Sequence, residues 1–218
     1  RDQAADLMGQ VLDGVASDLE VGAFCIAMRV KGESPEEMAG FLDAIHERLE
    51  MLPASGHPLV VLPSYNGARK LPVLTPLLAL LLAREGVPVL VHGTATEDRR
   101  VSSQDVLAAL DIPALQELDE IDNGQVVFAP TALLLPGLER LLDVRRTLGL
   151  RNSAHSLVKL MDPLAPVAGD SLIVGSYTHP EYAESMAATI ALTGSDALLL
   201  RGTAGEPVAD PRRIPQMG

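Results

Sequence analysis

The first fifty residues carry hydrophobic side chains at helical spacing. In the opening stretch these positions are Leu7, Met8, Val11, Leu12 and Val15. A second, mostly apolar segment runs from Leu19 to Val30, and a third helix is predicted to begin at Ser34. There a capping serine is followed by Pro35 at the first helical position and by Glu37, which completes a capping box. The pattern therefore predicts a helical region that ends at the Pro- and Gly-containing stretch 53–58, which is typical of a hinge.

Beyond residue 58, short apolar runs alternate with helical patterns. The predicted strands are 59–62, 87–91, 125–128, 172–174 and 197–200. The predicted helices among them begin at Thr75-Pro76, which is expected to cap its helix, at Ser102/Ser103 and near Thr178, where Thr178 and Glu181 match a capping box. Apolar strands alternating with helices indicate parallel pairing with helices on both faces. The predicted fold class is α/β: a small all-helical N-terminal domain hinged to an α/β domain with a mostly parallel sheet.

Composition narrows the class of protein. The 218 residues are 47% hydrophobic and 21% charged, which is typical of a globular chain. No apolar run is long enough to span a bilayer, and no secretory signal is recognisable at the start, so we predict a cytoplasmic protein without membrane contact. The single cysteine, Cys25, excludes an internal disulfide framework, iron–sulfur clusters and cysteine-rich zinc sites, and it fits a small core residue in a reducing compartment.

The charge is unevenly distributed. The formal net charge is −12, so long-range forces repel polyanions and a general polyanion binder is not expected. Residues 1–56 hold 4 Lys/Arg against 11 Asp/Glu, whereas residues 131–218 hold 8 against 9. The cations of the last third are also bunched, which leaves room for a local basic surface.

Common catalytic motifs are missing. None of the five histidines has a partner at secure metal-ligand spacing, and we predict no metal site and no catalytic residue. GxGxxG, GxxxxGK[ST] and GxSxG do not occur, so a Rossmann dinucleotide site, a P-loop and a hydrolase elbow lack support. His92 is the most interesting histidine, because it ends a predicted strand and open α/β sheets bind ligands at that edge.

Two stretches suggest anion binding. The first, residues 63–70, follows a predicted strand, and Gly67 can adopt positive φ while Asn66, Arg69 and Lys70 add donors. An ordinary Asn-Gly turn with solvated cations explains it equally well.

The second stretch is rich in arginine. Its cations are Arg140, Arg145, Arg146, Arg151 and Lys159. On a helix ending at Gly149, Arg145 shares a face with Leu138, Leu141 and Leu142 and is expected to point inward. Asn152 or Ser153 can cap the next helix beside Arg151, an arrangement that favours phosphate. A solvated arginine-rich face is the alternative.

Taken in order, these stretches resemble glycosyltransferase family 3, which has the anthranilate phosphoribosyltransferase fold (nucleoside phosphorylase/phosphoribosyltransferase-like). The strings that carry the resemblance are Ser64-Tyr-Asn-Gly-Ala-Arg-Lys70, Leu74-Thr-Pro-Leu-Leu-Ala79, Val87-Pro-Val-Leu-Val-His-Gly93, Leu148-Gly-Leu-Arg-Asn-Ser-Ala-His155, Ser176-Tyr-Thr-His-Pro-Glu-Tyr182 and Arg201-Gly-Thr-Ala-Gly-Glu206. The similarity is strongest to the YbiB-type branch of TrpD-like proteins. It implies a helical domain over 1–55, completed by helices at about 131–150, and an α/β domain over 56–130 and 151–218 that lacks the family's closing C-terminal part.

The resemblance also marks where this chain departs from active members. The positions that correspond to the loop and neighbours holding phosphoribosyl pyrophosphate (PRPP) are Ser64, Tyr65, Asn66, Gly67, Thr75, His92 and Gly93. Active members have a Gly-Thr-Gly-Gly-Asp loop here, and Tyr65 adds bulk where close approach is needed. The acidic pair that holds magnesium falls at Pro207-Val208, which offers no side-chain oxygen. We therefore expect the transfer chemistry to be lost.

Three functions stay open. The first is non-specific nucleic-acid binding through a basic cleft, as the YbiB-type branch implies, by a homodimer assembled through the helical domain and without a cofactor. The residues expected to contact nucleic acid or phosphate are Arg69, Lys70, Arg145, Arg146, Arg151 and Lys159. The second is an active PRPP-dependent transferase with an unknown acceptor and bound Mg²⁺. The third is a dimeric scaffold whose cations bind only structural anions.

Overall fold

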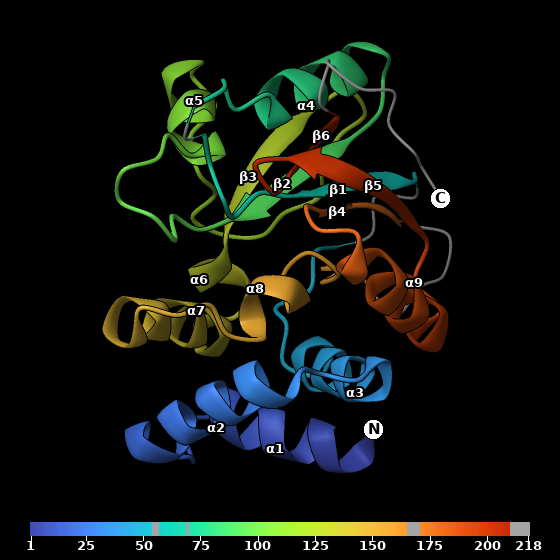
Figure 1. The fold of residues 1–218 in the computed structure, drawn as a ribbon. Helices are drawn as coiled ribbons and strands as arrows, with labels where there is room; N and C mark the ends of the chain where they lie inside the picture. Colours follow the sequence, from blue (N-terminus) through green and yellow to red (C-terminus); the bar gives the residue numbers. More distant parts are fainter. Residues whose placement is uncertain (54–56, 69, 165–170, 210–218) are drawn as a thin grey trace.

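A layer of N-terminal helices packs beneath a six-stranded sheet in the computed structural model (Figure 1). The structure describes residues 1–53, 57–68, 70–164 and 171–209. The described helices are α1 (Asp2–Leu12), α2 (Asp18–Lys31), α3 (Pro35–His46), α4 (Thr75–Arg84), α5 (Ser103–Ala109), α6 (Thr131–Leu134), α7 (Pro136–Leu148), α8 (Ala154–Leu157) and α9 (Glu181–Thr193). The described strands are β1 (Leu59–Pro63), β2 (Val89–Gly93), β3 (Val126–Pro130), β4 (Ser171–Tyr177), β5 (Ala197–Thr203) and β6 (Glu206–Ala209).

The helical layer begins where the sequence places good caps. The Ser34 hydroxyl accepts a hydrogen bond from the backbone N–H of Glu37, and the Ser34 backbone N–H donates to the Glu37 carboxylate, so the predicted capping box is confirmed. A second capping box, formed by Ser17 and Glu20, starts α2. Helix α7, far along the chain, packs on α1 and lies in the same layer (Figure 1).

The sheet has the strand order β3-β2-β1-β4-β5-β6. Strands β1 to β5 pair in parallel, and β6 pairs antiparallel with β5. The predicted fold class is thus confirmed. The sequence pattern did not predict strand β6, because Glu206-Pro-Val-Ala209 is too short and too mixed to stand out as a strand.

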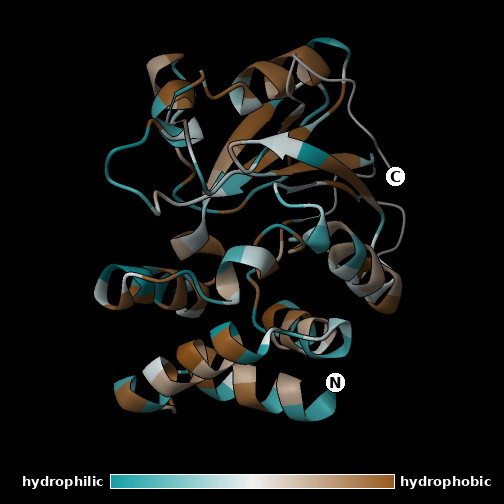
Figure 2. Ribbon diagram, in the orientation of Figure 1, coloured by the Kyte–Doolittle hydropathy of each residue, from teal (hydrophilic) through white to brown (hydrophobic). Residues whose placement is uncertain are grey.

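Two hydrophobic clusters cover the two faces of the sheet. Helices α4 and α5 lie on one face, and α8 and α9 lie on the other, towards the helical layer (Figure 1). The strands are apolar along most of their length, as Figure 2 shows by their brown colour, which is expected of parallel strands buried on both faces. The larger cluster runs from α1 and α3 into the sheet, so a continuous core joins the helical layer to the α/β part.

Two predicted helix starts were wrong in detail. Helix α4 begins at Thr75, but the Thr75 hydroxyl makes no capping bond. Helix α9 begins at Glu181 after Pro180, and Thr178 does not form the predicted capping box. The Thr75 hydroxyl donates to Glu206 instead, so this partner competes with the helix end for it. Among the described residues, no helix combines the length and apolar character that crossing a bilayer requires.

Candidate functional site

The loop after β1 holds an internal carboxylate. The backbone N–H groups of Asn66 and Gly67 each donate to Oε1 of Glu206 at 2.8 Å. The hydroxyls of Ser64 and Thr75 donate to Oε2 at 2.6 and 2.9 Å. Glu206 is 3% exposed. The predicted anion-binding loop therefore binds an anion, but the anion belongs to the chain itself.

The backbone around this loop is shaped for the contact. Gly67 has φ +62°, the positive value anticipated from the sequence, and it directs its N–H at the carboxylate. Glu206 arrives by the tight turn between β5 and β6, where Ala204 and Gly205 both have positive φ. The carbonyl of Gly205 accepts from the Asn66 side chain and from the Ser176 hydroxyl, each at 3.0 Å. These bonds fasten the turn to the loop.

Tyr65 fills the space on the inner side of the loop. Its hydroxyl lies 2.8 Å from Nδ1 of His92 and accepts from Thr131 at 3.0 Å, so the Tyr65 proton goes to His92. Burial raises the pKa of Tyr65 far above its ordinary value and lowers the pKa of His92 to about 3. Both rings stay neutral at physiological pH. Gly93, the last of the positions that correspond to the PRPP loop and its neighbours, ends β2 next to His92.

These residues do not fit a magnesium–diphosphate group. The backbone and hydroxyl donors that would hold the diphosphate are bonded to Glu206. The oxygens of Glu206 already accept four hydrogen bonds, and over the described ranges no group of acidic, histidine or cysteine side chains is arranged to hold a metal ion. A magnesium ion bridging a diphosphate needs oxygen ligands that are free to coordinate it.

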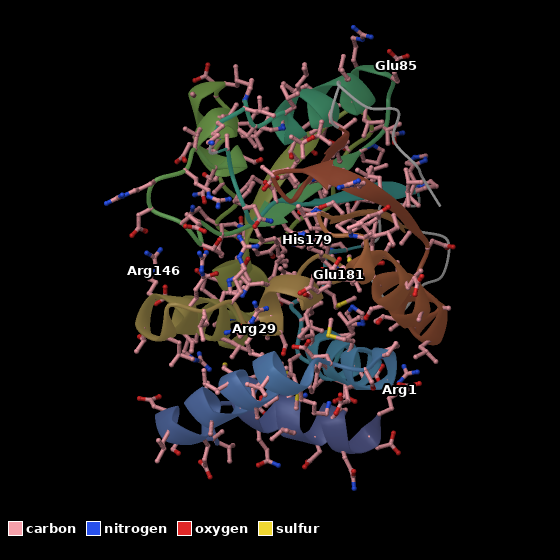
Figure 3. The ribbon with its side chains drawn as sticks, in the orientation of Figure 1. Arg1, Arg29, Glu85, Arg146, His179 and Glu181 are labelled. Atoms are coloured by element: carbon pink, nitrogen blue, oxygen red, sulfur yellow. The ribbon has the colours of Figure 1, made fainter. Side chains whose placement is uncertain are left out.

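A cavity of about 300 Å³ opens beside the loop, between the helical layer and the carboxyl end of β4. Its lining includes Met28, Arg29, Gly32, Glu33, Arg151, Asn152, His155, Ser156, Lys159, Ser176, Tyr177, Thr178, His179, Tyr182 and Met186. Figure 3 labels Arg29 on α2 and His179 after β4, which lie on the two sides of this region. Arg29, Arg151 and Lys159 share this lining with one carboxylate, Glu33, and Glu33 accepts a hydrogen bond from Ser153.

Lys159 is the most strongly perturbed cation of the cavity. Its ammonium donates to the Ser176 carbonyl at 3.0 Å. Burial, together with the positive charge of Arg151, lowers the pKa of Lys159 to about 8, and the charge of Glu206 opposes the shift. At pH 7 the side chain is still mainly cationic, so an anion that enters the cavity meets a poorly solvated ammonium.

A cluster of arginines borders the cavity. Arg145 points inward as predicted, and its Nη2 lies 2.5 Å from Oε1 of Glu97. Arg100 and Arg151 approach the same oxygen at 3.3 and 3.9 Å. Burial of Glu97 opposes ionisation, but the Arg145 hydrogen bond and the three positive charges lower the pKa of this carboxyl. One carboxylate therefore faces three guanidinium groups, and positive charge is in excess.

Arg151 connects the cluster to the loop. Its Nη2 donates to Oδ1 of Asn66 at 2.6 Å. Asn152 accepts from the N–H of Ala154, as a cap does, but α8 has only four residues and builds little dipole. Burial and nearby arginines lower the pKa of His155 to about 4, so this cavity histidine is neutral at physiological pH.

The other predicted cations lie elsewhere. Arg146 pairs with Asp98 and Asp143, and Figure 3 shows it on α7 well apart from Arg29 and His179. Lys70 is exposed and is not among the residues that line the cavity, and Arg69 lies outside the described residues. The structure thus brings together Arg145, Arg151 and Lys159 and leaves Arg146 and Lys70 apart.

Sequence reasoning missed Glu97, Arg100 and Glu206 as members of the site. Glu97 and Arg100 follow β2 in the chain, and their place after the carboxyl end of a parallel strand could have marked them. The sequence marks Glu206 only as the neighbour of Pro207-Val208. Its contact with a loop about 140 positions earlier leaves no local pattern.

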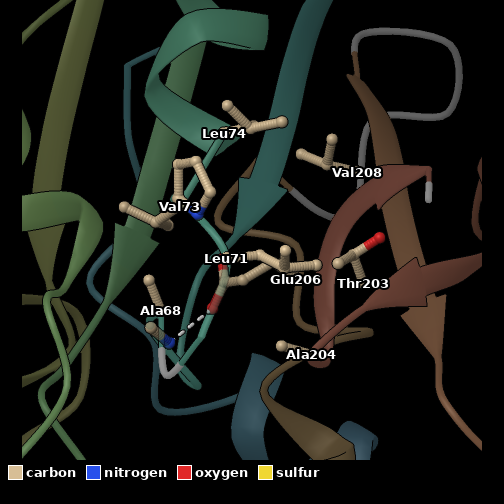
Figure 4. Close-up of a pocket in the computed structure, with 10 residues that line it drawn as sticks. Ala68, Leu71, Val73, Leu74, Thr203, Ala204, Glu206 and Val208 are labelled. Carbon is tan, nitrogen blue, oxygen red and sulfur yellow. Dashed lines mark hydrogen bonds between the residues drawn. The ribbon is translucent and has the colours of Figure 1, made fainter. Parts of the chain in front are cut away.

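A smaller apolar cavity of about 170 Å³ adjoins Glu206 on another side (Figure 4). Leu71, Val73 and Leu74 face Thr203 and Val208 across it. The Oγ1 atom of Thr203 is buried and has no hydrogen-bond partner among the described residues.

Comparisons with known proteins identify the family of the chain and agree with its fold. Residues 1–49 match the helical bundle domain of a glycosyl transferase family. The chain is 43% identical to the uncharacterized protein YbiB of Escherichia coli (strain K12), over the whole chain and 69% of YbiB. The chain belongs to glycosyltransferase family 3, in its YbiB-type branch. Family 3 relatives include the anthranilate phosphoribosyltransferase of Leifsonia xyli subsp. xyli, 32% identical over 74% of this chain and 47% of that enzyme.

A solved family 3 structure has the same fold. The crystal structure of anthranilate phosphoribosyltransferase (TrpD) from Thermus thermophilus is 25% identical and superposes with a TM-score of 0.77, over 92% of this chain and 61% of that one. The chain thus spans between about half and just over two thirds of the length of these family 3 proteins.

Proposed function

We propose that this family 3 chain binds nucleic acid without strong sequence preference, through the basic cavity between the helical layer and β4. The observation that carries the proposal is the meeting of Arg151 and Lys159 in one cavity, with Arg145 and Arg100 at its border. Unlike the loop after β1, the described lining of this cavity has too few carboxylates to neutralise its cations fully. A phosphate diester can therefore replace water at these groups.

The acidity of the rest of the chain restricts how binding occurs. With a net charge of −12, the protein repels a polyanion at long range and attracts it only near the cavity. Few phosphates are then neutralised, so affinity should fall moderately with salt rather than steeply. Tyr177 and Tyr182 line the cavity and offer stacking surfaces for unpaired bases. We therefore propose single-stranded nucleic acid as the preferred form.

A titration of single-stranded DNA at low and moderate salt tests the proposal. The double variant Arg151→Gln/Lys159→Met should weaken binding about tenfold or more, because each charge-assisted hydrogen bond contributes roughly 1.5–3 kcal/mol. The matched control, Arg84→Gln/Arg99→Gln, removes the same charge from exposed positions that do not line the cavity and should have little effect. Equal affinity of both double variants and the unmodified chain would refute the site.

Two further variants define the border of the surface. Arg145→Gln should weaken binding, since Arg145 adds positive charge beside Arg151. Arg146→Gln should weaken it less, because Arg146 is bonded to Asp98 and Asp143. The reverse order would move the nucleic-acid path from the cavity to the outer face of α7.

The transferase alternative has its own assay. Magnesium-dependent release of pyrophosphate from PRPP is measured with a panel of aromatic acceptors. We expect no turnover, because Glu206 occupies the donors that a diphosphate requires. Turnover above the rate without protein would restore the alternative.

We also propose that the chain forms a homodimer through its helical layer. Leu19, Ile26 and Val30 are exposed large apolar residues whose spacing places them along one face of α2, and the exposed Val15 lies just before that helix. Two copies would cover this face and extend the binding surface along one strand. Sedimentation of the chain and of Leu19→Glu/Val30→Glu tests this: the variant should be monomeric at concentrations where the unmodified chain is dimeric.

A further inference from the structure

We propose that the basic cavity holds the phosphorylated end of a nucleic-acid strand, through a terminal phosphate monoester that contacts Arg151, His155 and Lys159. This inference rests on the nucleic-acid binding proposed above and names the part of the ligand that enters the cavity. The cavity has a volume of about 300 Å³, at the lower end of the range for pockets that enclose small ligands. It therefore encloses one small group and not a stretch of strand.

The cations of the cavity lie at different depths. The Arg151 side chain is 41% exposed, so it lies at the opening. The Lys159 ammonium donates to the carbonyl of Ser176, a residue that is 2% exposed, and therefore lies further inside. A phosphate that contacts both groups has to enter past Arg151. An internal diester would bring strand on both sides into this space, whereas a terminal monoester brings strand on one side only.

The charge of the cavity fits a dianion better than a monoanion. Arg29, Arg151 and Lys159 line it, and Glu33 is the one carboxylate among the described residues of the lining. Three cations and one carboxylate leave two positive charges in excess. A phosphate monoester carries a charge of about −1.5 to −2 at pH 7, whereas each diester carries a single negative charge. A monoester therefore balances the excess, and a diester leaves part of it.

His155 adds a donor that the chain leaves unused. It is 9% exposed, and its Nε2 has no hydrogen-bond partner among the described residues. The backbone N–H of Asn152 donates to Nδ1 at 3.4 Å, which places the proton of the neutral ring on Nε2. The Asn152 amide oxygen, 3.2 Å from Nδ1, already accepts from the N–H of Ala154. His155 thus offers a hydrogen bond without adding charge.

The number of donors matches the number of oxygens on a monoester. His155 and Lys159 lie four positions apart, in α8 and the turn that follows it, and both line the cavity with Arg151. A phosphate monoester has three strong acceptor oxygens, one for each of these side chains. A diester has only two oxygens that are not esterified, so one donor would stay without a partner.

An aromatic pair at the same cavity can take the base next to the phosphate. The rings of His179 and Tyr182 both line the cavity, with centroids 6.4 Å apart and planes inclined by 50°. Stacking on a ring does not depend on which base is present. A strand end bound in this way therefore stays independent of sequence, as the proposed function requires.

The test measures how well short oligothymidylates displace an internally labelled strand from the unmodified chain, at constant ionic strength. One strand has a 5′ phosphate, one has a 3′ phosphate, and one has neither. A terminal phosphate should tighten binding at least about tenfold, because it gains charge-assisted hydrogen bonds. A preference for either phosphorylated strand supports the inference and shows which end enters.

Two further strands control for added charge. An unphosphorylated strand that is one nucleotide longer adds a diester without a monoester, so it should gain little. A circular strand has no end and should bind no better than the unphosphorylated linear strand. These comparisons use the unmodified chain and do not depend on the folding of a variant.

Variants assign the preference to the cavity. Lys159→Met should remove most of it, whereas Arg146→Gln, outside the cavity, should keep it. His155→Asn keeps an acceptor for the Asn152 N–H but loses the Nε2 donor, and it should reduce the preference. His155→Gln supplies an amide donor in place of Nε2 and should retain it.

The outcomes separate this inference from the proposed function. Equal affinity of the unmodified chain for strands with and without a terminal phosphate would overturn the inference and leave the proposed function standing. A preference that is unchanged in both Lys159→Met and His155→Asn would place the terminal phosphate outside the cavity and overturn the inference as well. Absence of binding to every strand would refute the proposed function itself, and the inference with it.

Discussion

The loop after β1 and the cavity beside it are both lined with anion-binding groups, yet only the loop is filled. In the loop, four donors converge on Glu206, which is 3% exposed. In the cavity, Arg151 and Lys159 share too few carboxylates to balance them. The two regions touch, because Arg151 donates to Asn66 of the loop. We therefore expect a ligand to bind where the chain leaves positive charge unbalanced, and not wherever donors are present.

The largest expected effect is the loss of protein stability when the carboxylate that fills the loop is removed. Glu206→Ala leaves the donors of Ser64, Asn66, Gly67 and Thr75 without their acceptor, and each unsatisfied buried group costs about 1–3 kcal/mol. Because water can enter the space that the truncated side chain leaves, we expect a loss of about 3 kcal/mol in the free energy of unfolding, measured by urea denaturation. Glu120→Ala, the exposed control, should stay within about 0.5 kcal/mol. Equal stability of both variants would show that the loop is not held by Glu206.

The next largest expected effect is the loss of stability at acid pH, to which one histidine in the loop region and one in the cavity contribute. The pKa of His92 beside the loop is about 3 and that of His155 in the cavity about 4, both below the ordinary value. Since the unfolded chain binds these protons first, stability is lost as pH falls below about 6.5. His92→Asn keeps an acceptor for Tyr65 and should reduce this slope by about 1.4 kcal/mol per pH unit. An unchanged slope would mean that His92 titrates normally.

The pKa values of the same two histidines should show whether a ligand has entered the cavity. Single-stranded DNA in the cavity should raise the pKa of His155, because a phosphate nearby favours the charged imidazole. His92, enclosed beside Tyr65, should keep its pKa. NMR titration of the two imidazoles with and without DNA measures this contrast, and equal shifts of both would contradict it.

Alkaline pH should weaken DNA binding in the cavity and leave the contacts of the loop unchanged. Lys159 has a pKa of about 8, so it passes from mainly charged at about pH 7 to mainly neutral at about pH 9. DNA affinity of the unmodified chain should then fall by up to about tenfold, whereas that of Lys159→Met should change little. Fluorescence anisotropy at fixed salt provides the measurement. A parallel fall in both proteins would assign the pH effect to other groups.

The smallest expected effect concerns the turn that delivers Glu206. Ala204→Gly removes the Cβ at a residue with φ +53° and should raise the free energy of unfolding by about 0.5 kcal/mol. Ala187→Gly, at an exposed position of α9, should lower it by about 1 kcal/mol. Opposite signs in urea denaturation would confirm that the turn is strained. A loss in both variants would contradict it.

Patterns along the chain were sufficient to predict most of the secondary structure, the parallel sheet, the family, the positive φ of Gly67 and the inward direction of Arg145. These features depend on local periodicity, on capping residues and on strings of neighbouring residues. Ser34 and Glu37, for example, define a helix start through contacts only three positions apart.

Long-range packing, in contrast, was needed to learn which anion the loop binds and which cations share a cavity. Glu206 contacts Asn66, which lies 140 positions earlier in the chain. Glu97 pairs with both Arg145 and Arg151, which belong to separate elements. Thr75 and Thr178, each expected to cap a helix, do not cap one, and the Thr75 hydroxyl turns to Glu206 instead. The physical reason is that a charged group pairs with the partner that lies nearest in the folded structure. The order of residues along the chain does not reveal how far apart its parallel strands lie in space.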